Sequence, residues 1–350
     1  MNVPLIPYLK DPIWILFAEV LKVIDSRSFQ QELTRNGMKD TNNIRITLKI
    51  ILLSIFFQTD VSHVYNEVSK CSRLNKFLNI THLPSLKKIR ENYHKYDEDI
   101  YLEIVLKTLN KVKFKKIHDL KAIVLDSTSV TLDLNLQGMF LSKEKLKEKD
   151  YKRGYSTSIG HYAGFQMTLA IDHDTCKPLA IIIHPGSPND TKIFDDIMNE
   201  LKRRRILKQG QLIFCDKGFY SLENYVIGIN KYKVVPFIFP KRKPSMLTLM
   251  DRIQHPLDYF EGVDYLNPIY VYLRDKLFNL LPRWEDFKRN RWKIEKVFEF
   301  MKDQLKSKSI HAYTKRSVSK HMFLNVLLMG LIVSLGYGKI ERITKLVNFE

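Results

Sequence analysis

Two aspartates follow short apolar runs that have the composition of buried strands. Asp126 comes directly after Ala-Ile-Val-Leu, and Asp216 comes directly after Leu-Ile-Phe-Cys. Carboxylates that end neighbouring strands emerge at one edge of a sheet, where they can share a metal ion. A site built from carboxylate oxygens favours Mg²⁺ or Mn²⁺ over zinc. Taken singly, each aspartate can equally be a solvated turn residue at a strand end, and that interpretation stays open here.

A third carboxylate comes from a helical pattern over residues 284–306. At 100° per residue, its apolar stripe consists of Ile294, Phe298, Met301 and Leu305. Glu295 lies on the adjacent polar face, together with Lys288, Arg291, Glu299 and Lys302. Glu295 could complete a metal site there while the cations hold phosphates. The alternative is an ordinary amphipathic helix, in which Arg291 and Glu295 form an i,i+4 ion pair worth roughly 0.2 to 0.5 kcal/mol.

The elements that would position these carboxylates have a mixed order. Apolar runs predict strands at 121–126, 165–171, 178–184, 211–215 and 232–239. Helical spacing appears at 190–202, 222–230 and 284–306, and an apolar helix at 318–335 is expected to pack on the sheet. Charged segments at 143–153 and 241–243 are interpreted as loops. Three strands followed by helix, strand, helix and strand indicate an α/β fold.

The first 115 residues are mostly helical in pattern. Helices are expected at 44–57, 62–77, 85–94 and 100–112. The turn at Leu83 and Pro84 joins two of them, and the second carries Lys87, Lys88 and Arg90. This segment is either a helix-turn-helix that faces DNA or a helical bundle with a solvated basic face.

The charge of the chain favours a polyanionic partner. Its 350 residues include 57 Lys and Arg against 38 Asp and Glu, a formal net charge of +19, while 45% hydrophobic residues exclude a disordered basic tail. Basic runs at 143–153, 202–205, 241–243 and 288–293 would contact phosphates. Trp284 and Trp292 beside the last run could stack on an extruded base, although we favour Trp292 as a core residue.

Other chemistries find little support in the residue spacing. Cys71, Cys176 and Cys215 are odd in number and widely spaced, which argues against a disulfide framework or a cysteine zinc site and favours a reducing cytosol. The histidines at 161, 173 and 184 lack metal-ligand spacing, and Ser127 has no partnered histidine pattern. The apolar segments 44–57 and 322–337 are expected to be buried helices, and no membrane partner is expected.

Four motifs taken together resemble the DDE transposases of bacterial and archaeal insertion sequences. They are LDST at 125–128, HPGSPNDTKIF at 184–194, CDKGFYS at 215–221 and RWKIEKVFEFMK at 291–302. As in that family, a basic residue, a glycine and an aromatic follow the second aspartate. The spacing Arg291, Glu295, Lys302 also agrees with the family signature, whose tyrosine is replaced by Lys288 with Phe287 beside it.

The resemblance implies an α/β fold with a ribonuclease H-like mixed sheet, flanked by helices and preceded by an all-helical domain. It implies a helical region at 1–115 that binds terminal repeats, a catalytic domain at 116–310 with a short insertion at about 240–282, and a C-terminal helical segment at 311–350 that packs on the core. The catalytic metal ligands would be Asp126, Asp216 and Glu295. Asn189 and Asp190 would support the site without holding the metal, unless they are simply a turn and a helix cap.

The same resemblance implies a reaction and its partners. Two Mg²⁺ ions, replaceable by Mn²⁺, would serve hydrolysis at the ends of an insertion sequence and strand transfer to target DNA. Lys217, Arg291, Lys302 and Lys288 would contact double-stranded DNA, both terminal inverted repeats and target. A homodimer on paired ends is expected, in the cytoplasm and on the nucleoid when DNA is bound. The alternatives are a nuclease of the same fold that cuts without joining, and an inactive transposase-derived DNA-binding factor.

Overall fold

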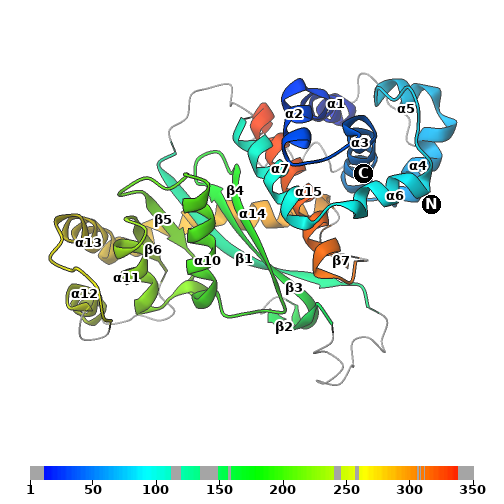
Figure 1. Ribbon diagram of the computed structural model, residues 1–350. Helices are drawn as coiled ribbons and strands as arrows, with labels where there is room; N and C mark the ends of the chain where they lie inside the picture. The colour runs from blue at the N-terminus through cyan, green and yellow to red at the C-terminus, as the bar shows by residue number, and fades with distance from the viewer. Residues whose placement is uncertain are drawn as a thin grey trace. The chain divides into compact units, whose positions relative to one another are not determined.

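A computed structural model describes residues 12–111, 120–134, 149–156, 159–239, 246–256, 260–305, 307, 309–310 and 312–337. The chain forms two compact units, one of residues 118–298 and one of residues 1–117 with 299–350. The first contains a mixed sheet with flanking helices, and the elements described before this sheet in the chain are all helices (Figure 1). This arrangement confirms the predicted α/β class with an all-helical N-terminal region.

Within the described residues of the 118–298 unit, six strands belong to the sheet. They are β1 (Ala122–Leu132), β2 (Lys152–Ser156), β3 (Gly160–Asp172), β4 (Pro178–Pro185), β5 (Leu212–Cys215) and β6 (Val235–Ile238). Their order is β2-β3-β1-β5-β6, and β4 also pairs with β3. β1 and β3 are antiparallel, whereas β1, β5 and β6 are parallel to one another. The parallel half therefore brings the carboxyl ends of β1 and β5 to the same side of the sheet.

Two sequence predictions about these strands are wrong. Asp126 does not end β1, because the strand continues to Leu132 through its antiparallel pairing with β3 as far as Thr131 opposite Gly164. The strand was expected to end with its apolar run, but pairing with β3 keeps the polar residues at 126–129 extended. Lys152 and Arg153, the end of the charged loop expected at 143–153, instead begin β2, which pairs with residues 160–164 of β3.

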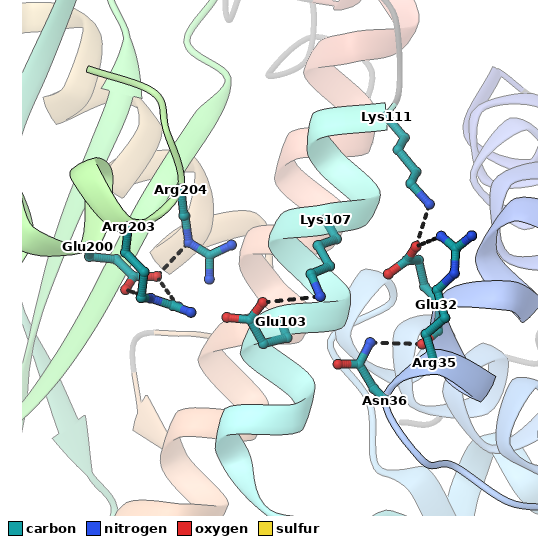
Figure 2. A network of polar contacts seen from close by, with 9 residues as sticks. All are labelled: Glu32, Arg35, Asn36, Glu103, Lys107, Lys111, Glu200, Arg203 and Arg204. Carbon is teal, nitrogen blue, oxygen red and sulfur yellow. Dashed lines mark hydrogen bonds and ion pairs between the residues drawn. The ribbon is translucent and has the colours of Figure 1, made fainter. Parts of the chain in front are cut away.

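Five helices complete or adjoin this unit. They are α10 (Asp190–Arg203), α11 (Leu222–Asn230), α12 (Met246–Gln254), α13 (Pro268–Leu280) and α14 (Lys288–Gln304). α10 packs against β3 and β4 through a buried stripe that includes Phe194 and Met198 (Figure 1). Near the end of α10, Glu200 accepts hydrogen bonds from Arg203 and Arg204 (Figure 2). The two cations thus lie at the C-terminus of the helix, where positive charge is favourable. The expected helix at 284–306 begins later, at Lys288, because residues 281–287 form a 3₁₀ turn.

The helices of the other unit are α1 (Pro12–Asp25), α2 (Arg27–Arg35), α3 (Thr41–Phe56), α4 (Val61–Lys70), α5 (Ser72–Phe77), α6 (Leu86–Lys95), α7 (Glu98–Lys111) and α15 (Lys315–Ile332). α15 is followed by a π-helical turn at Val333–Tyr337, and β7 (Ser309–Ile310) precedes it. The single helix predicted at 62–77 is divided, because Cys71 adopts an extended conformation between α4 and α5. The exposed residues Lys87, Lys88 and Arg90 lie on α6, which begins at its N-cap Ser85.

α15 is the buried helix of this unit. It packs against α7, α3 and α1 of the same unit. The expected packing of this helix on the sheet stays a prediction. A Cβ on Gly330 would lie 2.4 Å from Leu109 Cδ2, so glycine permits the close approach of α15 to α7. The segment Lys315–Leu335 is long and apolar enough to cross a membrane by composition, but 89% of its most apolar window is buried inside the protein. Its burial agrees with the expected core helix.

Charged side chains are also buried between the helices. Glu32 of α2 is 2% exposed and accepts hydrogen bonds from Lys111 of α7 and from Arg35 (Figure 2). Burial alone would raise the pKa of Glu32, but the two cations outweigh it and lower that pKa below its ordinary value. Lys49 of α3, also 2% exposed, donates to Asp25 at 2.8 Å and to the carbonyl of Leu78 at 2.6 Å. These pairs connect helices that are distant in sequence.

Candidate active site

The two aspartates occupy equivalent positions on neighbouring parallel strands. The last pair that joins β1 to β5 is Leu125 with Cys215, and the residue that follows each in the chain is an aspartate, Asp126 and Asp216 respectively. Both aspartates are half-buried and both line one cavity of about 410 Å³. The sequence prediction that these two residues lie close together is therefore supported by their register and by the shared cavity.

The end of β5 frees the space beside Asp126. The pairing of β1 with β5 ends at Leu125, so the N–H of Ser127 lies beyond it. Ser127 N–H instead donates a hydrogen bond to Asp126 Oδ1 at 2.7 Å. After Asp216 the chain turns sharply through the 3₁₀ turn Lys217–Phe219, where the buried Phe219 ring packs 6.5 Å from Phe194 of α10. That aromatic contact holds the turn against α10.

A third carboxylate of the cavity comes from the first turn of α10. Asn189 caps this helix, since its side chain accepts the N–H of Thr191 at 3.2 Å, as the capping interpretation predicts. Asp190 lines the cavity and accepts a hydrogen bond from Gln166 Nε2 of β3 at 2.5 Å. A Cβ on Gly218 would lie 2.2 Å from Asp190 Oδ2, so a larger residue there would displace that carboxylate. Asp190 thus contacts the turn that follows Asp216.

The lining of the cavity is rich in oxygen and negative in charge. Besides the three aspartates it includes hydroxyl and amide side chains from β1, β2, β3 and the loop before α10, namely Ser127, Thr128, Ser129, Tyr155, Ser156, Tyr162, Gln166, Ser187 and Asn189. Burial raises the pKa of the Cys215 thiol, and the nearby charges of Asp216 and Asp126 raise it further. Hard oxygen donors of this kind fit Mg²⁺ or Mn²⁺. Among the described residues, however, no three His, Cys, Asp or Glu side chains are close enough to hold one ion.

Glu295 lies on α14, as predicted, with its side chain exposed. The predicted apolar stripe of this helix is buried at all four positions: Ile294, Phe298, Met301 and Leu305. Glu295 is not among the described residues that line the cavity. The structure therefore brings Asp126, Asp216 and Asp190 together around one cavity, but leaves Glu295 outside its lining.

Two contacts hold the beginning of α14 on the strands that carry the site. The Phe287 ring lies 5.9 Å from Phe214 of β5 and 5.1 Å from Phe237 of β6. Lys293 Nζ donates to the carbonyl of His173, in the turn between β3 and β4, at 2.8 Å. Phe287, which stands beside the replaced tyrosine of the family signature, is thus a packing residue for α14.

The predicted DNA-contact residues have different surroundings. Lys217 is exposed in the turn after Asp216, and Lys302 is half-buried near the end of α14. The backbone of Lys288 and Arg291 lies in α14, while their side chains and the basic run 241–243 lie outside the described part of the chain. Trp292 was favoured as a core residue and is instead 47% exposed, because it lies opposite the buried stripe, with Lys296 Nζ 5.8 Å from its ring centre.

Sequence reasoning missed Gln166. This residue is 7% exposed and lies within the apolar run of β3, where its pairing with Ser129 places it beside the cavity. The signal available in the sequence was a glutamine within the apolar run Phe-Gln-Met-Thr-Leu. Burying an unpaired polar group is costly, so a glutamine in a buried strand indicates a polar partner nearby.

The chain belongs to the transposase DDE domain family, whose model matches residues 117–331. No curated protein matches the chain. Among solved structures it is similar to a piggyBac transposase in a synaptic complex with hairpin DNA, at 8% sequence identity and a TM-score of 0.48, over 97% of this chain and 80% of that one. The family match includes all of β1 to β6 and the segment that carries Glu295.

Proposed function

We propose that the chain is a DNA transposase of an insertion sequence, which hydrolyses phosphodiester bonds at the element's ends and joins them to target DNA. The observation that carries this proposal is the shared register of Asp126 and Asp216 at one oxygen-rich cavity, within a chain of the transposase DDE domain family. The ribonuclease H-like arrangement of the sheet is part of the same proposal.

The proposed metal ligands are Asp126, Asp216 and Glu295. Together these three carboxylates would hold two Mg²⁺ or Mn²⁺ ions. Bound there, the ions would activate water and stabilise charge on the leaving 3′-oxygen. Glu295 lies on an exposed part of α14 outside the lining of that cavity, and its place in this set rests on the spacing of Arg291, Glu295 and Lys302 in the family signature. The aspartates themselves need no rearrangement to face one cavity.

The remaining residues would bind and orient DNA. Lys217, Lys288, Arg291 and Lys302 would contact phosphates, and the net charge of +19 would make affinity strongly dependent on salt. Asn189 and Asp190 would support the site without reacting: Asn189 by capping α10, and Asp190 by contacting the turn after Asp216. The helical region would bind terminal repeats, and two copies of the chain would pair the two ends, in the cytoplasm and on the nucleoid.

The direct test is cleavage of a labelled duplex that carries the element's terminal repeats. With Mg²⁺ or Mn²⁺, the native chain should release 3′-hydroxyl ends, and the Asp216→Asn variant should bind the duplex without cutting it. Asp133→Asn, an exposed aspartate just past the end of β1, is the matched control and should cut normally. Equal cutting by native chain and Asp216→Asn would contradict the proposed site.

Two alternatives give different outcomes in the same assay. A nuclease of this fold would cut the ends but would not join them to an added target duplex. An inactive DNA-binding factor would bind and never cut, and its biological effect would survive Asp126→Asn. The intact pair of aspartates on neighbouring strands favours the enzyme over the binding factor.

A further inference from the structure

The side chain of Gln166 is placed between the central sheet and the turn that carries the second aspartate. It extends from β3, and its Nε2 donates to Asp190 Oδ1 at 2.5 Å. On its other side the Asp190 carboxylate rests on Gly218, two residues after Asp216. A continuous series of contacts therefore runs from β3 through Gln166 and Asp190 to the Asp216 turn.

The amide of Gln166 is retained at a cost to stability. Only 7% of this residue is exposed, and its Oε1 has no hydrogen-bond partner among the described groups. A buried acceptor left unpaired costs about 1 to 3 kcal/mol. An apolar residue of the same size would avoid that cost, so stability alone does not explain a glutamine here.

A charge-assisted hydrogen bond explains it better. The donor end of the amide fixes one oxygen of a carboxylate, and such bonds are shorter and stronger than bonds between neutral groups. Groups that orient a metal's ligands from behind typically change metal affinity or activity by 10- to 100-fold when they are removed.

We infer that Gln166 is a positioning residue for Asp216: it holds the Asp190 carboxylate against Gly218 and thereby fixes the turn that presents the second aspartate to the metal. This inference rests on the proposed function. It assigns no metal bond to Gln166 or Asp190, and the action passes through the backbone at Gly218.

The test measures Mn²⁺ binding to the full chain by electron paramagnetic resonance, without DNA and without a cleavage readout. Gln166→Met removes the amide at nearly constant volume and should weaken Mn²⁺ binding about tenfold. Its melting temperature should stay within about 4 °C of the native value, because the lost bond is offset by removal of the unpaired Oε1.

Thr168→Val is the matched control. Thr168 lies two residues along the same strand and face, is fully buried and bonds Ser127 Oγ at 2.9 Å, but it does not line the cavity. Its Mn²⁺ affinity should equal that of the native chain. If Gln166→Met binds Mn²⁺ as tightly as the native chain does, the inference is overturned.

A second variant covers the case in which Gln166→Met unfolds. Gln166→Asn keeps a buried amide but shortens it by one methylene, so the bond to Asp190 is lost and a tenfold loss of Mn²⁺ affinity is again expected; native affinity would overturn the inference. If the native chain itself binds no Mn²⁺, both the proposed function and this inference are wrong. If Asp216→Asn loses Mn²⁺ binding while both Gln166 variants bind Mn²⁺ as the native chain does, this inference is refuted and the proposed function is not.

Discussion

Asp126 and Asp216 occupy the first positions beyond the last parallel pair of β1 and β5, which is Leu125 with Cys215. At this point β5 ends and the chain enters a 3₁₀ turn, whereas β1 continues in its pairing with β3. The two carboxylates therefore lie at the corner where one strand ends and its neighbour goes on. A corner of this kind leaves space beside a rigid strand, and the cavity of about 410 Å³ is found there.

Neutralising either aspartate should abolish cleavage and leave the fold intact. Asp126→Asn and Asp216→Asn should each lower the cleavage rate by about 10³-fold or more, since several kcal/mol of charge stabilisation in the transition state would depend on the metal that we propose they hold. Single-turnover cleavage and filter binding should be measured on the same preparations. Loss of DNA binding in parallel with cleavage would show that these residues act in folding or binding instead.

The third carboxylate can be identified by comparing two glutamates on one helix. Glu295 and Glu299 are both exposed, and they are four residues apart on α14. Glu295→Gln should lose cleavage by about 10³-fold, whereas Glu299→Gln should retain it within a factor of about 3, which is below 1 kcal/mol. The reverse result would transfer the metal-ligand role to Glu299.

The Phe287 ring should stabilise the unit that contains the sheet. Phe287→Ala removes its contacts with Phe214 and Phe237 and should lower the free energy of unfolding by about 2 kcal/mol, less than a fully buried phenylalanine because the ring is half-exposed. Urea unfolding measures this change. Trp292→Ala, an exposed aromatic in α14 five residues further along the chain, should stay within about 0.5 kcal/mol of the native chain. Equal effects would argue against a specific role of Phe287.

Lys320 should make stability rise in mildly alkaline solution. Its side chain is fully buried in α15, with Nζ donating to the carbonyl of Tyr93 at 3.0 Å and lying over the Tyr101 ring. Burial, with the neighbouring charge of Arg316, lowers the pKa of Lys320 to about 8 from 10.5, although Glu98 and Asp97 oppose this shift.

The sign of that effect follows from proton binding. Between pH 8 and 10.5 the unfolded chain holds the Lys320 proton more tightly than the folded chain does, so the free energy of unfolding increases with pH. Lys320→Met removes the group and should flatten this rise. Urea midpoints of both proteins at pH 7, 8, 9 and 10 provide the measurement, and parallel curves would contradict the assignment.

The helical spacing around Glu295 was readable from the sequence because it is local. A stripe repeating at 3.6 residues can be buried on only one side, and Ile294, Phe298 and Met301 are buried as that spacing requires. The bounds of α11, 222–230, were likewise predicted from its helical pattern, and the structure adds Ser221 as its N-cap. Trp292 shows the limit of residue type as a guide, since a large aromatic was favoured for the core and is exposed.

By itself, the sequence determined the α/β class, the order of its main elements and the family motifs, because short apolar runs and helical periodicity depend on neighbouring residues. Only the tertiary structure decided that Asp126 lies inside a long strand, that it shares a register with Asp216, and that Gln166 contacts Asp190. Those relations join positions 24 to 90 residues apart in the chain. Strand pairing and side-chain packing over such separations are set by the whole fold, and no local pattern encodes them.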